Sequence, residues 1–113
     1  MAAAALVDMH GGSVKQALAA ASMALQNTLG LVCDPVANRV EVPCLGRNIS
    51  AAANALTSAN VALAGFAEVI PLDEVIATHN TIGRGLPREL RCTCLGGLSI
   101  TESARKVERR LAR

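Results

Sequence analysis

Residues 31–46 read LVCDPVANRVEVPCLG and form the stretch of the chain where a helix is least able to continue. Asp34-Pro35 and Pro43 interrupt a helix, because proline lacks a backbone N–H and restricts the residue before it. Val40-Glu41-Val42 favours a brief extended segment between them. A cysteine stands near each end of the stretch, Cys33 and Cys44. The stretch therefore predicts one irregular, cysteine-bearing loop between helices.

Helical patterns precede this loop. Residues 2–10 resemble the end of a helix that is stopped by Gly11-Gly12. Ser13, followed three residues later by Gln16, predicts a capping box that opens a second helix. We expect this helix to run to about residue 29, with Gly30 as its C-terminal stop. Its apolar positions fall at helical spacing on one face: Val14, Leu18, Ala21 and Leu25.

The part of the chain after the loop is also predicted to be helical. The expected elements are a small-residue helix over 48–66, a helix from Pro71 to near Gly83 and Gly85, a short helical turn over 86–90, and a final helix over 102–111. Gly96-Gly97 marks a hinge or a point of close approach, and the Thr101 hydroxyl can cap the final helix. The fold class is therefore all-α.

Alanine dominates the apolar content of this chain. Hydrophobic residues make up 51% of its 113 residues, and Phe66 is the single aromatic residue. Burial stabilises by roughly 25 cal/mol per Å², so a small alanine side chain contributes little by itself. Small side chains do allow helix backbones to approach closely and pack densely. We therefore expect a helical bundle-like segment that belongs inside a larger helical body.

Positive charge gathers at the C-terminal end, although the net charge of the chain is only +2. The basic residues concerned are Arg105, Lys106, Arg109, Arg110 and Arg113. Such a cluster could form the electrostatic footprint of a nucleic-acid-binding protein. However, Glu102 and Glu108 are interleaved with it, no aromatic residue is available for stacking, and cations are favourable near a helix C-terminus. Residues 102–113 are therefore predicted to form a solvated terminal basic helix without a nucleic-acid partner.

The sequence carries no pattern typical of a membrane span or an export signal. Residues 51–70 are the longest weakly polar stretch, yet they include Asn54, Ser58, Asn60 and Glu68. The first residues, MAAAALVDMHGGSVK, lack the basic region of a secretory signal. We therefore expect no membrane partner and a cytoplasmic location, where thiols stay reduced.

Spacing alone leaves the role of the four cysteines open. Cys33 and Cys44 lie eleven positions apart on a proline-stiffened loop, which could gather thiolates for zinc or an iron–sulfur cluster. They could equally be small buried hydrophobes. Cys92 and Cys94 could complete a four-thiolate site with them, pack in a core, or act as reactive thiols. The two histidines, His10 and His79, are isolated, and the sequence identifies no catalytic base.

The two loop segments Asn27-Thr28-Leu29-Gly30-Leu31-Val32-Cys33-Asp34-Pro35-Val36 and Glu41-Val42-Pro43-Cys44-Leu45-Gly46-Arg47-Asn48 resemble the cluster-binding signature of iron–sulfur-dependent L-serine dehydratases. Further stretches resemble the alpha region of the same family: Ala62 to Gly65, Val69 to Ile76, Ile82 to Pro87, and Leu95 to Leu98. The resemblance covers nearly the whole chain, up to about Thr101. The chain is thus similar to the C-terminal part of the family's catalytic alpha region, a segment of a larger helical catalytic domain.

This resemblance implies a chemistry. The family converts L-serine to pyruvate and ammonia with a 4Fe–4S cluster held by three cysteines. Its open iron acts as a Lewis acid on the substrate hydroxyl, while a separate base removes the α-proton. By position in the motif, Cys33 and Cys44 are two of the three ligands. Implied partners are L-serine, an upstream alpha segment, and a beta subunit or domain. The oligomeric state is left open, a homo-oligomer included.

The chain also departs from the family pattern. The remaining cluster cysteine lies upstream of the position where this chain begins, so Met1 resembles an internal methionine and the chain alone is expected to be incomplete and inactive. Asn38-Arg39 replaces a commoner glycine-containing pair, and asparagine tolerates the left-handed conformation needed there. Cys92 and Cys94 stand where the family usually has other residues, so they are not ligands by resemblance, although they could misligate iron. Two alternatives remain: an iron–sulfur lyase for another small amino acid such as cysteine, and a non-catalytic helical or zinc-binding remnant.

Overall fold

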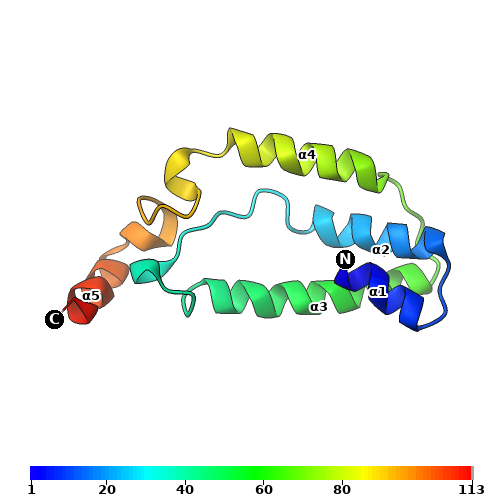
Figure 1. Cartoon of the computed structure of the whole chain (residues 1–113), viewed down its shortest axis with the longest axis horizontal. Coiled ribbons are helices and arrows are strands. Elements are labelled where there is room, and N and C mark those ends of the chain that lie inside the picture. Colours follow the sequence, from blue (N-terminus) through cyan, green and yellow to red (C-terminus); the bar gives the residue numbers. More distant parts are fainter. Residues whose placement is uncertain (113) are drawn as a thin grey trace. The chain divides into compact units, whose positions relative to one another are not determined.

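The computed structural model describes residues 1–112 and confirms an all-α fold (Figure 1). The helices of this part of the chain are α1 (Ala2–Met9), α2 (Val14–Gln26), α3 (Cys44–Leu63), α4 (Leu72–Gly85) and α5 (Glu102–Leu111). Short 3-10 turns are η1 (Val36–Asn38), η2 (Arg88–Leu90) and η3 (Gly97–Ile100). The chain divides into two compact units. We call Met1–Leu29 with Ser50–Arg84 the helical unit, and Gly30–Ile49 with the chain from Gly85 onward the cysteine unit.

The expected helix starts are largely confirmed. The Ser13 hydroxyl accepts the Gln16 N–H at 3.3 Å, and the Gln16 side chain accepts the Ser13 N–H at 2.9 Å, which completes the capping box of α2. Thr101 caps α5 by accepting the Ala104 N–H at 3.3 Å. The α4 boundaries also agree with the prediction. These caps stabilise because they satisfy backbone donors that the first helical turn leaves free.

Three boundaries differ from the prediction. Helix α2 ends at Gln26, not near Leu29, because tighter turns replace helical bonding before Gly30, whose φ is +74°. Helix α3 begins at Cys44, not Asn48, because the Pro43 carbonyl accepts the Arg47 N–H at 3.1 Å, so proline starts the helix without needing a donor. It ends at Leu63, not Phe66, since Gly65 adopts φ +91° and the Phe66 N–H returns to the Val61 carbonyl.

Residues 40–42 were expected to be extended, and this was wrong. Val40–Pro43 form a turn that leads directly into α3. The Val36 N–H donates to the Val42 carbonyl at 2.9 Å, and the Leu45 N–H donates to the Val40 carbonyl at 2.8 Å. The Val42-Pro43 peptide bond is cis. Asn38 has φ +55°, as its tolerance of left-handed geometry predicts, and its neighbour Ala37 has φ +51°.

Alanine forms most of the core of the helical unit, where α1, α2 and α3 pack together (Figure 1). The buried cluster consists of Ala3, Val7, Ala19, Ala20, Ala55, Ala59 and Ala62. Side chains of α1 and α3 pack closely against the Gly12 backbone, because a Cβ added there would lie 2.4 Å from Val7 Cγ1 and 2.9 Å from Leu63 Cδ2. Dense contacts between small side chains therefore replace the large buried areas of an ordinary core.

Amide side chains tie the helix ends of this unit together. The Gln16 Nε2 lies 3.3 Å from the carbonyls of both Ala62 and Leu63, at the end of α3. The Asn54 amide donates to the Ala24 carbonyl at 2.9 Å, and the Asn27 amide donates to Asn54 Oδ1 at 2.6 Å, at the end of α2. The bonds to the Ala24 and Leu63 carbonyls satisfy acceptors in the last turns of α2 and α3, where helical partners run out.

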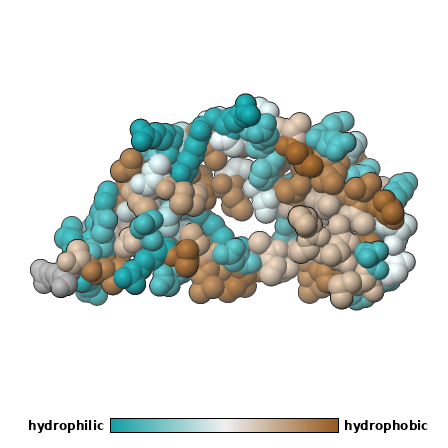
Figure 2. Space-filling model, in the orientation of Figure 1, coloured by the Kyte–Doolittle hydropathy of each residue, from teal (hydrophilic) through white to brown (hydrophobic). Residues whose placement is uncertain are grey.

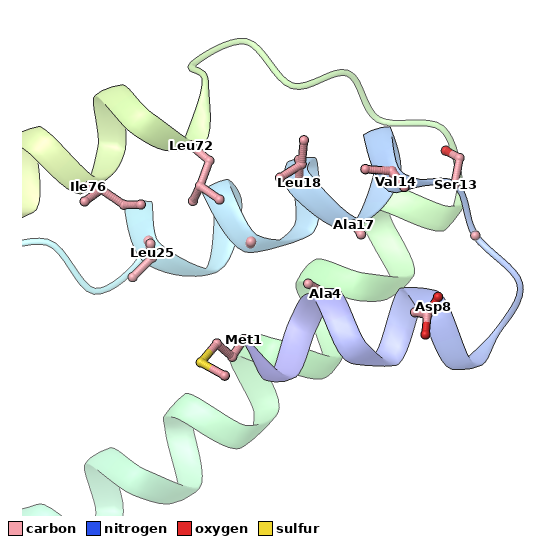
Figure 3. A pocket seen from close by; sticks show the side chains of 12 residues that line it. Met1, Ala4, Asp8, Ser13, Val14, Ala17, Leu18, Leu25, Leu72 and Ile76 are labelled. Atoms are coloured by element: carbon pink, nitrogen blue, oxygen red, sulfur yellow. The ribbon is translucent and has the colours of Figure 1, made fainter.

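Of the apolar face predicted for α2, Ala21 is buried, but Val14 and Leu18 do not enter the core. Val14 and Leu18 are 77% and 44% exposed, and apolar residues are visible on the surface of the molecule (Figure 2). Together with Leu25 of α2 and with Leu72 and Ile76 of α4, they line an apolar groove of about 360 Å³ (Figure 3). The core instead takes the smaller side chains of the neighbouring positions. The helical unit thus carries an open apolar surface.

The terminal helix α5 pairs its charges along its own surface. Lys106 lies 2.6 Å from Glu102, and Arg105 lies 2.9 Å from Glu108. These exposed pairs fit the expectation of a solvated helix, and each contributes little to stability. Arg113 of the predicted basic cluster lies outside the described residues. Among the helices of residues 1–112, none is long and apolar enough to cross a membrane.

Candidate thiol site

Cys33 is held by backbone hydrogen bonds to a segment far along the chain. Its N–H donates to the Leu90 carbonyl at 2.9 Å, and its carbonyl accepts the Cys92 N–H at 2.8 Å. These two bonds form an isolated parallel bridge between Cys33 and Arg91. Both partners belong to the cysteine unit. The bridge therefore fixes the backbone of Cys33 next to that of Cys92. The φ angle of Cys92 is +62°.

Asp34, the next residue, joins three segments of the cysteine unit. Its carboxylate is 2% exposed, and it accepts a hydrogen bond from Arg47 Nη1 at 2.6 Å and one from the Leu98 N–H at 2.7 Å. Arg47 Nη1 also donates to the Val32 carbonyl at 2.8 Å. Because Arg47 lies one turn after Cys44 on α3, the ion pair links the segment that carries Cys33 to the helix that begins with Cys44.

The environment of Asp34 favours its ionised form. Burial opposes ionisation, but the Leu98 N–H and the Arg47 guanidinium outweigh that effect and lower the pKa of the Asp34 carboxyl below its ordinary value. A buried carboxylate of this kind is tolerated because its oxygens are paired and hydrogen-bonded. The Asp34 carboxylate is therefore an anion that joins Arg47 and Leu98 within the cysteine unit.

The glycine pair after Cys94 makes room for this carboxylate. Gly97 has φ +60°, and a Cβ added there would lie 2.4 Å from Asp34 Oδ2 and 2.8 Å from Asp34 Cβ. A Cβ at Gly96 would likewise meet Glu89, at 2.9 Å from its Cβ. The prediction of close approach at Gly96-Gly97 is confirmed. Just beyond, the buried Ser99 hydroxyl donates to the Pro35 carbonyl at 2.9 Å.

Two of the free thiols, Cys92 and Cys44, act on the Cys33 thiol. The side-chain hydrogen bond between Cys33 and Cys92, followed by burial, raises the pKa of the Cys33 thiol to about 11. Repulsion from Cys92 and from Cys44 adds to this rise, while the Arg47 guanidinium opposes it. Cys94 points elsewhere, with its Sγ 3.5 Å from the Pro35 carbonyl and 3.9 Å from Asn38 Oδ1. The Cys33 thiol thus contacts Cys92 and lies within electrostatic reach of Cys44.

The cysteine thiols of this unit meet only part of what an iron–sulfur cluster or a zinc ion needs. Thiolates are the ligands that iron–sulfur clusters and zinc prefer, and the fold gathers such groups at the two motif positions. Within residues 1–112, however, no set of three or more His, Cys, Asp or Glu side chains is arranged to hold a metal ion. A metal group held by these thiols would therefore need at least one further donor.

Sequence reasoning missed part of this arrangement. It did not assign a role to Asp34 or Arg47, although both lie inside the quoted motif. It brought Cys92 and Cys33 together only as members of a four-thiolate site and did not predict the backbone bridge that joins their segments. The Gly96-Gly97 signal pointed to a close approach without naming the neighbour. Neither histidine belongs to the cysteine unit. His10 Nδ1 lies 2.7 Å from the Leu6 carbonyl near the end of α1, and His79 lies on α4.

The fold and the site together define an all-α protein whose proline-containing loop carries free thiols. Residues 1–99 match the sequence family described as serine dehydratase alpha chain. The chain belongs to this family.

Similar proteins support the same assignment. The "Probable L-serine dehydratase, alpha chain" of Latilactobacillus sakei is 55% identical over 101 residues, which is 89% of this chain and 48% of that protein. The L-serine dehydratase alpha chain of Peptoniphilus asaccharolyticus is 50% identical over 96% of this chain and 37% of its own length. L-serine dehydratase 1 of Escherichia coli is 43% identical over 88% of this chain and 22% of its own length. This chain thus spans less than half the length of these relatives.

Proposed function

We propose that this chain is the C-terminal part of the catalytic alpha region of an L-serine dehydratase, which converts L-serine to pyruvate and ammonia. The region assigned to it is the whole chain, residues 1–113, with 102–113 as a terminal basic helix. The family match over residues 1–99 supports the activity. The observation that carries the site is the buried Asp34–Arg47 pair, which ties the two cysteine-bearing segments of the motif together.

Cys33 and Cys44 are proposed as two cysteine ligands of a 4Fe–4S cluster. When bound, such a cluster supplies a Lewis acid for loss of the substrate hydroxyl. The residues of this chain then have distinct tasks. Cys33 and Cys44 donate sulfur, and the Asp34–Arg47 ion pair joins the segments that carry them. The Arg47 guanidinium partly offsets the rise in the pKa of the Cys33 thiol.

The remaining parts of the active protein are proposed to come from outside this chain. These are the third cluster ligand and the serine-binding elements in an upstream alpha segment, together with a beta subunit or domain. The short share of each relative that is matched supports this. The open apolar groove of the helical unit does so as well, because apolar surface of that kind gains free energy when it is covered. Four free thiols fit a reducing cytoplasm.

Anaerobic reconstitution with iron and sulfide tests the ligand assignment. With the upstream alpha segment restored, we expect about four iron and four acid-labile sulfide atoms per chain and a visible charge-transfer band. Cys33→Ser and Cys44→Ser, singly and together, should abolish the band and the serine turnover, because each removes a thiolate donor. Cys94→Ser is the matched control, since its thiol points to Pro35, and it should retain both.

Two results would count against the proposal. A full cluster in the Cys33→Ser, Cys44→Ser double variant would show that the ligands lie elsewhere. Turnover of serine at ordinary enzymatic rates by the chain without its upstream segment would show that the chain is complete, contrary to the expectation that it is inactive alone.

A further inference from the structure

Cys33 and Cys92 are neighbouring free thiols, which can react with an oxidant. We propose that Cys92 and Cys33 form an oxidative modification site, at which a peroxide joins them as a disulfide when no cluster is bound. Cys92 provides the exposed thiol that meets the oxidant, and Cys33 provides the resolving thiol. The site lies wholly within the cysteine unit.

The backbone bridge supplies the proximity that this reaction needs. The Cys33 N–H and C=O are both engaged by the segment around Arg91, at 2.9 and 2.8 Å, so neither residue has to travel to meet the other. The two thiols also interact, since Cys92 raises the pKa of the Cys33 thiol. A disulfide normally requires Cβ atoms about 3.5–4.5 Å apart, which only a preformed contact provides without backbone movement.

The other thiols are less well placed for this pairing. Cys94, two residues from Cys92, hydrogen-bonds the Pro35 carbonyl and Asn38 instead of a thiol. Cys44 begins helix α3, and its influence on Cys33 is that of a nearby charge and not of a hydrogen bond. The geometry therefore selects one pair among the possible pairings of four cysteines.

The reaction balances with hydrogen peroxide as the oxidant. The sulfur of Cys92 attacks one peroxide oxygen, the O–O bond breaks, and Cys92 becomes a sulfenic acid as the first water leaves. The sulfur of Cys33 then attacks the sulfur of Cys92, the S–O bond breaks, and the second water carries away the oxygen and the proton. In total the two thiols lose two electrons and two protons, and one peroxide is reduced to two waters.

This disulfide has a consequence for cluster assembly, which rests on the proposed function. A sulfur bound in a disulfide cannot donate to iron as a thiolate. Oxidation of the cluster-free chain would therefore withhold Cys33 from the cluster, and a dithiol would restore it.

Peptide mass spectrometry tests the pairing directly. The full chain is purified reduced and without cluster, exposed to equimolar hydrogen peroxide, alkylated and digested with trypsin, which separates Cys33, Cys44 and the Cys92–Cys94 pair into three peptides. We expect a cross-link between the Cys33 peptide and the peptide that begins at Cys92, with loss of two hydrogens. It should vanish in Cys92→Ser, persist in Cys94→Ser and disappear with dithiothreitol. Thermal unfolding of both variants checks that they remain folded.

The results of the cross-linking and iron-loading experiments test the disulfide separately from the proposed cluster ligands. A dominant cross-link through Cys44 or Cys94, or none at all in the folded chain, would overturn the modification site while leaving the cluster assignment intact. With the upstream segment restored, the oxidised wild type should load several-fold less iron than the oxidised Cys92→Ser variant, and dithiothreitol should abolish the difference. If the Cys33–Cys92 disulfide formed but iron loading stayed the same, oxidation would not control cluster assembly. Cys33 would then not be a cluster ligand.

Discussion

Replacing Asp34 with alanine is expected to lower the free energy of unfolding of the cysteine unit by about 3 kcal/mol. The change leaves the Arg47 guanidinium without its carboxylate and the Leu98 N–H without its acceptor. Breaking a buried pair costs more than the pair itself contributes, because an unpaired polar group remains. The lower end of the usual range applies, since Arg47 is 30% exposed and water can partly solvate it. Denaturant unfolding and hydrogen exchange at the Leu98 amide measure the loss.

Two variants sharpen this prediction. Asp34→Asn preserves the shape of the side chain and one acceptor, so it should cost less than the alanine variant. Asp8→Ala removes an exposed carboxylate from α1 and should change stability by less than about 0.5 kcal/mol. If Asp34→Ala changed the free energy of unfolding as little as Asp8→Ala and left the Leu98 amide protected from exchange, Asp34 would not stabilise the cysteine unit.

Gly97→Ala is expected to be similarly damaging, for two separate reasons. At φ +60° a residue with a Cβ pays about 1–2 kcal/mol of backbone strain. The added carbon would also lie 2.4 Å from Asp34 Oδ2, which is buried and held by two hydrogen bonds. Overpacking of this kind costs about 1–3 kcal/mol. We expect a combined loss of about 3 kcal/mol, measured by denaturant unfolding.

A helical glycine provides the control for this variant. A Cβ at Gly83 of α4 would meet nothing within 4 Å, so Gly83→Ala should be neutral or stabilise by about 0.5–1 kcal/mol. The Gly97→Ala, Asp34→Ala double variant should cost less than the sum of the two single losses, because the alanine at position 34 removes the atoms that the new Cβ meets first. Strict additivity would mean that Gly97 and Asp34 do not share a contact.

The parts of this fold that the sequence predicted depend on atoms only a few residues apart. Ser13 and Gln16 build their capping box over three positions, and the Thr101 hydroxyl caps the Ala104 N–H over the same spacing. Gly30 takes up positive φ by itself. The start of α3 was misplaced because proline was treated as a helix breaker. At this position, Pro43 only has to offer a carbonyl, so it opens the helix.

The site was harder to predict because its geometry depends on distant residues. Cys33 and Cys44 could be named from the motif, and their role as ligands stays a prediction. Nothing local to Asp34 indicated that Leu98, 64 positions away, would donate to it. Cys92 was set aside as a non-family residue, yet the bridge at Arg91 places it against Cys33. Likewise, the spacing of Val14 and Leu18 showed an apolar face but not that smaller alanines would take the core.

The alanine core of the helical unit also determines which amino-acid substitutions destabilise this protein. In most domains the harmful core changes are truncations, which leave voids. Here Ala20, Ala59 and Ala62 have almost nothing left to remove. Enlargement is the danger instead, since even one extra methyl must push apart backbones in contact. Conservative exchanges such as alanine to valine, harmless on many protein surfaces, would be among the changes that purifying selection tolerates least in these three helices.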